Sequence, residues 1–215
     1  HVVADINESN FLIGNDATVY LVDTDSAQIK DTNRLFRCEV GKPEYTAPEL
    51  TYKAFREQDR NISTDVFAYS VAIWQILSGG SHPTDGKFLG SGDPPSVTNR
   101  LRSGEYPALL INDHNYETLS RIPSESISPR LRQLIAAGLD VNPNNRPSLT
   151  QFQKILQENL NNLQQCSNKS QHWFEGSQCP FCERNKKALF DPWVKPIETI
   201  ENISQTSLPA ISFNS

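Results

Sequence analysis

The sequence predicts a mainly α fold, in which a bundle of helices carries one small β-hairpin and a short extension rich in cysteine and histidine. Two apolar, β-branched runs separated by Gly14-Asn15-Asp16, a turn-forming triplet, predict the hairpin. Apolar residues at helical spacing, each group following a residue that can cap a helix, predict the helices. Three of the four cysteines lie between residues 166 and 182 and define the extension.

The composition is that of a globular protein. The 215 residues are 37% hydrophobic and 21% charged, which supplies enough apolar material for a core. The net charge of −5 argues against nucleic acid as a partner, because phosphate contacts need clustered lysine and arginine. The most apolar helix candidate, residues 66–77, is too short to span a bilayer, and no signal peptide opens the chain. We therefore expect a cytoplasmic location, with no membrane partner for this piece.

The hairpin brings three oxygen-bearing side chains together. Residues 11–13 and 18–22 form its strands, so Asn10 stands at its entry and Asp23 at its exit, with Asp5 just before them. Carboxylate and amide oxygens close in space are the ligands that Mg²⁺ needs when it bridges phosphate oxygens. The sequence therefore predicts a Mg²⁺ and phosphate site beside the hairpin.

Five motifs occur in an order that resembles the large, C-terminal lobe of the protein kinases. Residues 5–10, Asp-Ile-Asn-Glu-Ser-Asn, resemble the catalytic loop, and Asp23-Thr24-Asp25 resembles a divergent DFG motif. The end of the activation segment with its APE, the start of the long central helix and the DPxxRP motif are matched by residues 41–49, 65–70 and 142–147. Together the motifs cover roughly the first three quarters of the chain.

The small lobe of a kinase, with its glycine-rich loop and its Lys–Glu pair, has no match in this sequence. Residue 1 is His and the sequence contains no methionine. We therefore expect an internal or C-terminal piece of a longer protein, with the missing lobe upstream.

The resemblance implies a protein serine/threonine kinase acting on a protein substrate. It implies that Asp5 orients the substrate hydroxyl and accepts its proton, and that Asn10 and Asp23 hold Mg²⁺. ATP would then bind at the seam with the upstream lobe. The isolated piece, without the lobe that covers ATP, is expected to have little or no activity.

Four positions depart from the family pattern. In the family, an arginine that binds the phosphate of a phosphorylated activation loop commonly stands where this chain has Ala4. Regulation by phosphorylation through that arginine is therefore in doubt. Asn7 replaces the lysine that reaches the transferred phosphate, and Asp25 replaces the glycine of DFG. Lys42 replaces a threonine that contacts the catalytic aspartate. We hypothesise that the Lys42 ammonium supplies the charge that Asn7 lacks.

Under this resemblance, residues 23–49 form the activation segment, and their few periodic apolar positions predict a loop. Arg146 is compatible with an ordinary surface cation, but the family pattern implies a buried bidentate pair with Glu49. Asp65 is expected to stabilise the first turn of its helix and also to accept hydrogen bonds from the catalytic-loop backbone.

Capping residues and helix breakers delimit the remaining elements. Ser78-Gly79-Gly80 predicts a C-cap, and residues 82–95, rich in Gly, Pro, Asp and Ser, predict a surface loop. Ser128 precedes a proline as an N-cap, while Ser148 and Gln151 have capping-box spacing. The predicted helices cover residues 66–77, 96–103, 129–139 and 149–163.

The extension has the spacing Cys-x5-His-x6-Cys-x2-Cys, formed by Cys166, His172, Cys179 and Cys182. A CxxC turn points two thiolates at one ion, and a cysteine and a histidine from the preceding segment complete a tetrahedron. We therefore expect a closed structural Zn²⁺ site. A redox-active CxxC and a chance cluster are the alternatives, and a disulfide would leave His172 unexplained.

The motifs divide the chain into three expected parts: a kinase large lobe over residues 1–163, a zinc-binding knuckle over 164–184 and a flexible tail over 185–215. An active kinase is the first hypothesis because Asp5, Asn10 and Asp23 are all present. Asn7 and Asp25 suggest the second, a pseudokinase-like binding scaffold. The third hypothesis is a zinc-stapled protein-interaction module.

Overall fold

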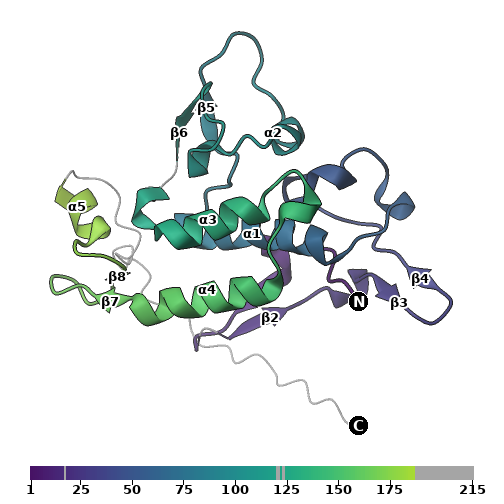
Figure 1. The fold of residues 1–215 in the computed structure, drawn as a ribbon, viewed down its shortest axis with the longest axis horizontal. Helices are drawn as coiled ribbons and strands as arrows, with labels where there is room; N and C mark the ends of the chain where they lie inside the picture. Colours follow the sequence, from purple (N-terminus) through teal and green to yellow (C-terminus); the bar gives the residue numbers. More distant parts are fainter. Residues whose placement is uncertain (17, 120–121, 123, 187–215) are drawn as a thin grey trace, which may run out of the picture.

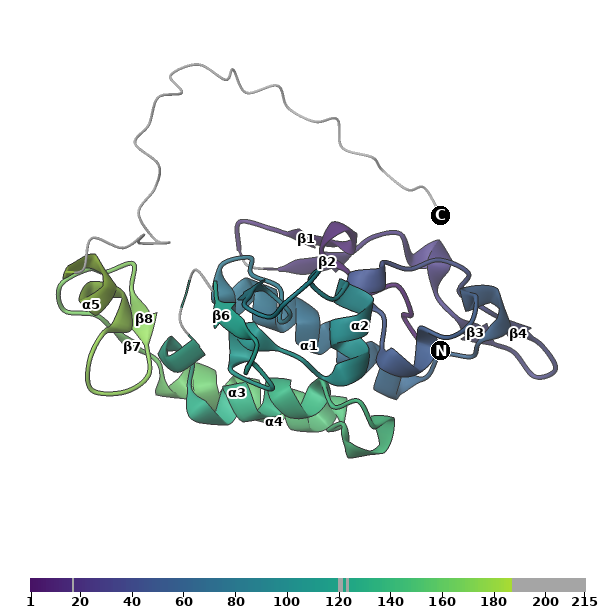
Figure 2. The same ribbon diagram turned by 90° about the horizontal axis from the view of Figure 1, so that it is seen from above.

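The computed structural model of the chain describes residues 1–16, 18–119, 122 and 124–186. Helices form its centre, two-stranded sheets surround them, and the Cys/His module lies at one end (Figures 1 and 2). The α-helices are α1 (Ile62–Ser78), α2 (Val97–Ser103), α3 (Pro129–Gly138), α4 (Leu149–Asn162) and α5 (Pro180–Lys186). Residues 187–215, most of the predicted flexible tail, lie outside the described residues.

Within the described part of the chain, the strands form four antiparallel two-stranded sheets, β1 with β2, β3 with β4, β5 with β6 and β7 with β8. Their bounds are β1 (Phe11–Ile13), β2 (Val19–Leu21), β3 (Ile29–Lys30), β4 (Leu35–Phe36), β5 (Gly86–Phe88), β6 (Tyr116–Thr118), β7 (Gln164–Gln165) and β8 (Trp173–Phe174). Short 3-10 turns occur at Glu8–Asn10, Thr24–Ser26, Pro43–Tyr45, Pro48–Leu50, Phe55–Glu57, Pro107–Leu109, Ser124–Ser126 and Pro143–Asn145.

The β1–β2 hairpin is the one predicted, with Phe11 opposite Leu21. Two predicted loops were wrong in part. Residues 82–95 contain β5, which pairs with β6, and residues 23–49 contain the β3–β4 hairpin. Strands of two or three residues are too short to show an alternating apolar pattern, so no strand period can be detected in these segments.

Helix α1 is the centre of the core. The Asn61 side chain accepts hydrogen bonds from the amides of Ser63 and Thr64. The Thr64 hydroxyl in turn accepts a hydrogen bond from the Asn61 amide, which makes a capping box. The helix therefore begins at Ile62, earlier than predicted, and places Asp65 in its first turn. Its end follows the prediction, because Gly79 adopts a left-handed φ of 74°. Its fully buried side chains include Phe67, Val71 and Trp74.

Helix α3 contacts both α1 and α4, and the three run side by side (Figures 1 and 2). Gly138 makes this packing possible, since a Cβ at this position would collide with Ser70 Oγ of α1 and lie 3.0 Å from the Phe152 ring of α4. The N-cap of α3 at Ser128 and the capping box of α4 at Ser148 and Gln151 are as predicted. No helix among the described residues is long and apolar enough to cross a bilayer.

The Cys/His module follows α4 directly and lies at the opposite end of the molecule from the β3–β4 hairpin (Figure 2). Phe174 and Phe181 form a small apolar cluster with the cysteines, and Ile122 of the main body joins it. Glu175 binds the last turns of α4, accepting hydrogen bonds from Asn159 at 2.8 Å and Asn162 at 3.3 Å. These contacts fasten the module to the helical body.

Candidate functional site

The first residues of the chain are anchored on the start of α1. Asp65 accepts hydrogen bonds from the amides of Val3 and Ala4, each at 2.9 Å. Ala4 has a left-handed φ of 70°, an unfavourable conformation for a residue with a Cβ, and this carboxylate holds it in place. Burial raises the pKa of Asp65, while the two amides favour the charged form. The sequence predicted that Asp65 binds the catalytic-loop backbone, and the structure places these bonds on the two residues directly before that loop.

Two side-chain amides hold the carboxylate of Asp5. Asn7 Nδ2 donates to Asp5 Oδ1 at 3.0 Å, and Asn10 Nδ2 donates to Asp5 Oδ2 at 3.1 Å. The other end of the Asn7 amide is fixed as well, because its Oδ1 accepts a hydrogen bond from the Ser9 amide at 3.0 Å. Both asparagines are buried. From the sequence Asn7 was only a missing lysine, whereas in the structure it supports Asp5.

Asp5, Asn10 and Asp23 line one hollow of about 230 Å³. The amide of Val22 donates to the Asn10 carbonyl at 2.9 Å, which brings the exit of the hairpin against its entry. Asp23 has a left-handed φ of 54°, a conformation that is uncommon for residues other than glycine and that clusters at functional sites. The hollow also has apolar walls, formed by Val2, Val3, Leu21, Val22 and Ala27. The residues that the sequence predicted for Mg²⁺ and phosphate thus share one cavity.

Lys42 borders a neighbouring hollow that Asp5 also lines, but its ammonium is engaged by the catalytic loop. Lys42 Nζ lies 2.8 Å from Glu8 Oε1 and 2.5 Å from Ser9 Oγ. Partial burial acts to raise the pKa of Glu8, but hydrogen bonds from Lys42 and Tyr45 make the net shift downward. Lys42 therefore forms an ion pair with Glu8 of the catalytic loop.

Glu49 and Arg146 form the bidentate ion pair expected from the sequence. Arg146 Nη1 and Nη2 each lie 2.7 Å from a carboxylate oxygen of Glu49. The Arg146 side chain is fully buried, and Glu49 is 28% exposed. Arg146 also donates to the carbonyls of Asp140 at 2.9 Å and Ser63 at 3.1 Å, and its guanidinium covers the Phe67 ring. The end of the activation segment is thereby joined to α1 and to the loop before α4.

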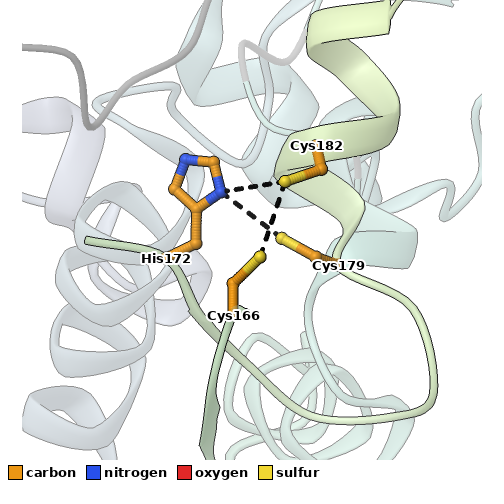
Figure 3. A group of neighbouring side chains, drawn as sticks. All are labelled: Cys166, His172, Cys179 and Cys182. Atoms are coloured by element: carbon orange, nitrogen blue, oxygen red, sulfur yellow. Dashed lines mark hydrogen bonds between the residues drawn. The ribbon is translucent and has the colours of Figure 1, made fainter. Parts of the chain in front are cut away.

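A second cluster gathers Cys166, His172, Cys179 and Cys182, whose side chains point toward one centre (Figure 3). Their donor atoms all lie within 4.8 Å of one another. Cys166 follows β7 and His172 precedes β8, and the Cys166 amide donates to the His172 carbonyl at 2.9 Å, which closes this turn. Cys179 precedes α5, and Cys182 lies in its first turn. All four thiols of the chain are free.

The spacing of the donor atoms fits tetrahedral zinc. Zn–S bonds of about 2.3 Å and Zn–N bonds of about 2.1 Å at tetrahedral angles place two sulfurs about 3.8 Å apart, and sulfur and nitrogen about 3.6 Å apart. The sulfurs of Cys166 and Cys182 are 3.5 Å apart, and His172 Nδ1 lies 3.4 Å and 3.6 Å from those of Cys179 and Cys182. Four ligands of this kind leave no open position for a substrate.

Comparison with known proteins bears on the first of these sites. The family model described as the protein kinase domain matches residues 2–159, which include Asp5, Asn10, Asp23 and the Glu49–Arg146 pair. The Cys/His module lies beyond the matched residues.

Three curated proteins are similar in sequence. Protein kinase YegI of Escherichia coli O157:H7 is 28% identical over 199 residues, which cover 88% of this chain and 30% of that protein. Protein kinase YegI of Escherichia coli strain K12 has the same identity and coverage. Receptor protein-tyrosine kinase CEPR2 of Arabidopsis thaliana is 26% identical over 156 residues, 72% of this chain and 15% of that protein. The chain therefore spans less than a third of the length of these relatives.

Proposed function

Because the chain belongs to the protein kinase family, we propose that it is the C-terminal catalytic lobe of an enzyme that phosphorylates Ser/Thr hydroxyls of a protein substrate with ATP. One observation carries the proposal: Asp5, Asn10 and Asp23 line a single hollow. Phosphoryl transfer asks a protein mainly to position the reactants and to neutralise charge, and these three side chains suit both tasks.

Asp5 orients the acceptor hydroxyl and takes its proton as the new O–P bond forms. The amides of Asn7 and Asn10 hold its carboxylate in one rotamer, which limits the orientations that it can adopt. Since Asn10 Nδ2 is bound to Asp5, Asn10 Oδ1 is the atom that can face a metal, together with the Asp23 carboxylate. When bound there, Mg²⁺ would neutralise charge on the ATP phosphate oxygens.

A kinase small lobe from outside this sequence would complete the ATP site, and we propose it as the main partner. The hollow lined by Asp5, Asn10 and Asp23 opens between apolar walls, which suit the cover that such a lobe provides. Apolar side chains of the β1–β2 hairpin are exposed beside it and would become buried: Leu12, Ile13, Val19 and Tyr20.

We further propose the division into a large lobe over residues 1–163, a knuckle over 164–184 and a tail over 185–215, with a cytoplasmic location. Zn²⁺ in the knuckle would have a structural role, because Cys166, His172, Cys179 and Cys182 form a closed ligand set. The ion would hold β7, β8 and α5 together and so keep the module seated against α4.

A pseudokinase-like scaffold, or a zinc-stapled interaction module, is the second candidate. The engagement of Lys42 with Glu8 and Ser9 favours it, because the ammonium proposed to replace the family lysine is already bound to these two side chains. Such a protein would bind ATP or a partner without turnover.

The two candidates differ in Mg²⁺-dependent ATP turnover by the full-length protein. We expect Asp23→Ala to reduce turnover by about a hundredfold or more, because a metal ligand is lost. Asp25→Ala is the matched control, since this exposed carboxylate lies two positions away and does not line the hollow. Equal rates for wild type and Asp23→Ala would reject the kinase and favour the scaffold.

A further inference from the structure

We propose that Arg60 is a positioning residue that fastens the activation segment, residues 23–49, to the catalytic loop and holds the two together without activation-segment phosphate. This inference rests on the proposed kinase function. Arg60 belongs to none of the family motifs and lies just before α1.

The guanidinium of Arg60 bridges the two segments. Nη1 donates to the carbonyl of Ala4, directly before Asp5, and Nη2 donates to the carbonyl of Val40 in the activation segment. Arg60 is only 7% exposed, and its guanidinium carbon lies 4.7 Å from the centre of the Phe55 ring, which covers it. One buried cation thus binds one carbonyl from each segment.

The backbone of Arg60 is tied to the same segment by a second contact. Gln28 Nε2 donates to the Arg60 carbonyl at 2.7 Å, and the Arg60 amide donates to Gln28 Oε1 at 2.8 Å. Gln28 is itself buried and exchanges backbone hydrogen bonds with Val2 at 2.9 Å and 3.0 Å. The catalytic loop and both halves of the activation segment are therefore all connected through Arg60.

Gly41 shows how closely the segment approaches this cation. A Cβ at Gly41 would lie 3.1 Å from Arg60 Nη2 and 3.2 Å from the Phe55 ring, closer than most real Cβ contacts. Because glycine has no Cβ, Gly41 allows the backbone of the activation segment to approach the Arg60 guanidinium this closely. Arg60 also lies close enough to Asp65 for its charge to favour the ionised carboxylate that anchors Ala4.

These contacts remove the need for a phosphate. The arginine that would answer activation-loop phosphate is Ala4 here, and the buried Arg60 guanidinium binds backbone carbonyls that are present in every state of the protein. A surface ion pair adds to the tether, since Arg37 Nε lies 2.6 Å from Asp59 Oδ1. The activation segment is therefore held by the buried Arg60 and by the exposed Arg37–Asp59 pair, and neither contact involves a phosphate.

Hydrogen exchange in the full-length protein tests the tether independently of activity. Arg60→Ala should accelerate exchange in peptides covering residues 38–47 by about tenfold or more, while peptides of α1 and α3 keep their wild-type rates. Arg56→Ala is the control, because this arginine is 71% exposed and lies four positions earlier. Unchanged exchange at residues 38–47 in Arg60→Ala would overturn the proposal.

Activity measurements test the consequence. Phosphatase-treated wild type should keep its kcat within about twofold, whereas Arg60→Ala should lose about tenfold in kcat at unchanged KM for ATP. Arg60→Lys, which cannot fork to two carbonyls, should lie between them. A tenfold loss on dephosphorylation of wild type, or a normal kcat for Arg60→Ala, would contradict the proposal.

Two further outcomes can be told apart. If wild type shows no turnover, the proposed function fails, and the exchange measurement still decides whether Arg60 is a tether. If Arg60→Ala does not fold, Gln28→Ala loosens the same connection from the other side and must show the same selective increase in exchange at residues 38–47. Uniformly faster exchange in Gln28→Ala would instead assign both residues to general stability.

Discussion

Glu49 and Arg146, which lie 97 positions apart in the sequence, are joined by two hydrogen bonds of 2.7 Å each. Because Arg146 also binds the carbonyls of Ser63 and Asp140, one buried side chain fixes three segments at once. The end of the activation segment is therefore held against the start of α1, where Asp65 holds the catalytic loop. The catalytic loop and the end of the activation segment are thus both anchored to the start of α1.

Glu49→Ala is expected to lower the free energy of unfolding by about 3–5 kcal/mol, because it strands the buried charge of Arg146. Urea denaturation of the mutant and wild type measures this change. Glu49→Ala combined with Arg146→Met should recover part of the loss, since the uncompensated charge is gone. Glu39→Ala, at an exposed position of the same segment, is the control. A loss below about 1 kcal/mol in Glu49→Ala would mean that the pair behaves as a surface salt bridge.

Lys42→Ala is expected to reduce kcat by about tenfold or more with little change in the KM for ATP, because a cation near the transferring phosphate acts mainly on the transition state. Steady-state ATP turnover by the full-length protein measures both constants. Glu8→Gln should not reduce kcat, since it frees the ammonium from its partner. Lys53→Ala, an exposed lysine, serves as control. Normal turnover by Lys42→Ala would show that this lysine only ties the activation segment to Glu8.

Metal analysis should find about one zinc per chain, and Cys179→Ser should lose most of it, because a closed site needs all four ligands. Removal of zinc by a chelator should accelerate hydrogen exchange in β7, β8 and α5 while α1 and α3 remain protected, since the module has its own apolar cluster. Cys38→Ser is the matched control and should keep its zinc. A metal-free wild type that retains protection of the module would leave the cluster without a metal role.

His82 is expected to make stability pH-dependent. The Thr84 amide donates to His82 Nδ1 at 3.2 Å, so Nδ1 accepts, and Nε2 donates to the Glu44 carbonyl at 2.9 Å. This arrangement needs the neutral ring, and burial lowers the pKa of His82. The unfolded chain therefore binds a proton more readily, with a pKa near about 6.5. Stability is complete above that pH and falls as the pH drops through it toward the folded-state pKa.

Urea denaturation between about pH 5 and pH 8 measures this effect of His82. His82→Gln should flatten the decline in the free energy of unfolding at the acidic end. His114→Gln, at an exposed histidine, should not change it. The same acidic decline in His82→Gln as in wild type would exclude His82 as its source.

The sequence predicts three of the helix ends from their capping residues, whereas the capping box of Asn61 and Thr64 at the start of α1 was missed. Ser128 and Ser148 form the predicted N-caps and Gly79 the predicted C-cap, because caps are local contacts between residues three or four positions apart. The β3–β4 and β5–β6 pairings were missed, since strands of two or three residues are too short to show an alternating pattern.

The candidate site divides in the same way. Asp5, Asn10 and Asp23 could be found from the sequence because a short hairpin brings them together. Arg60 and Gln28 could not, because the partners of Arg60 lie 20 to 56 positions away and neither residue belongs to a motif. The support that Asn7 gives to Asp5 was missed for another reason: its position is defined in the family by a lysine, and the side-chain amide makes a different contact.

Transfer of labelled phosphate from ATP to protein hydroxyls by the full-length protein tests the catalytic role of the Asp5 site most directly. We predict Mg²⁺-dependent label on serine or threonine, and a loss of about 10²–10⁴-fold in Asp5→Asn, which removes the base while keeping the size of the side chain. Thermal unfolding of Asp5→Asn should confirm that the fold is kept. Labelling by Asp5→Asn at the wild-type rate, or no labelling by wild type, would contradict a catalytic role for this site.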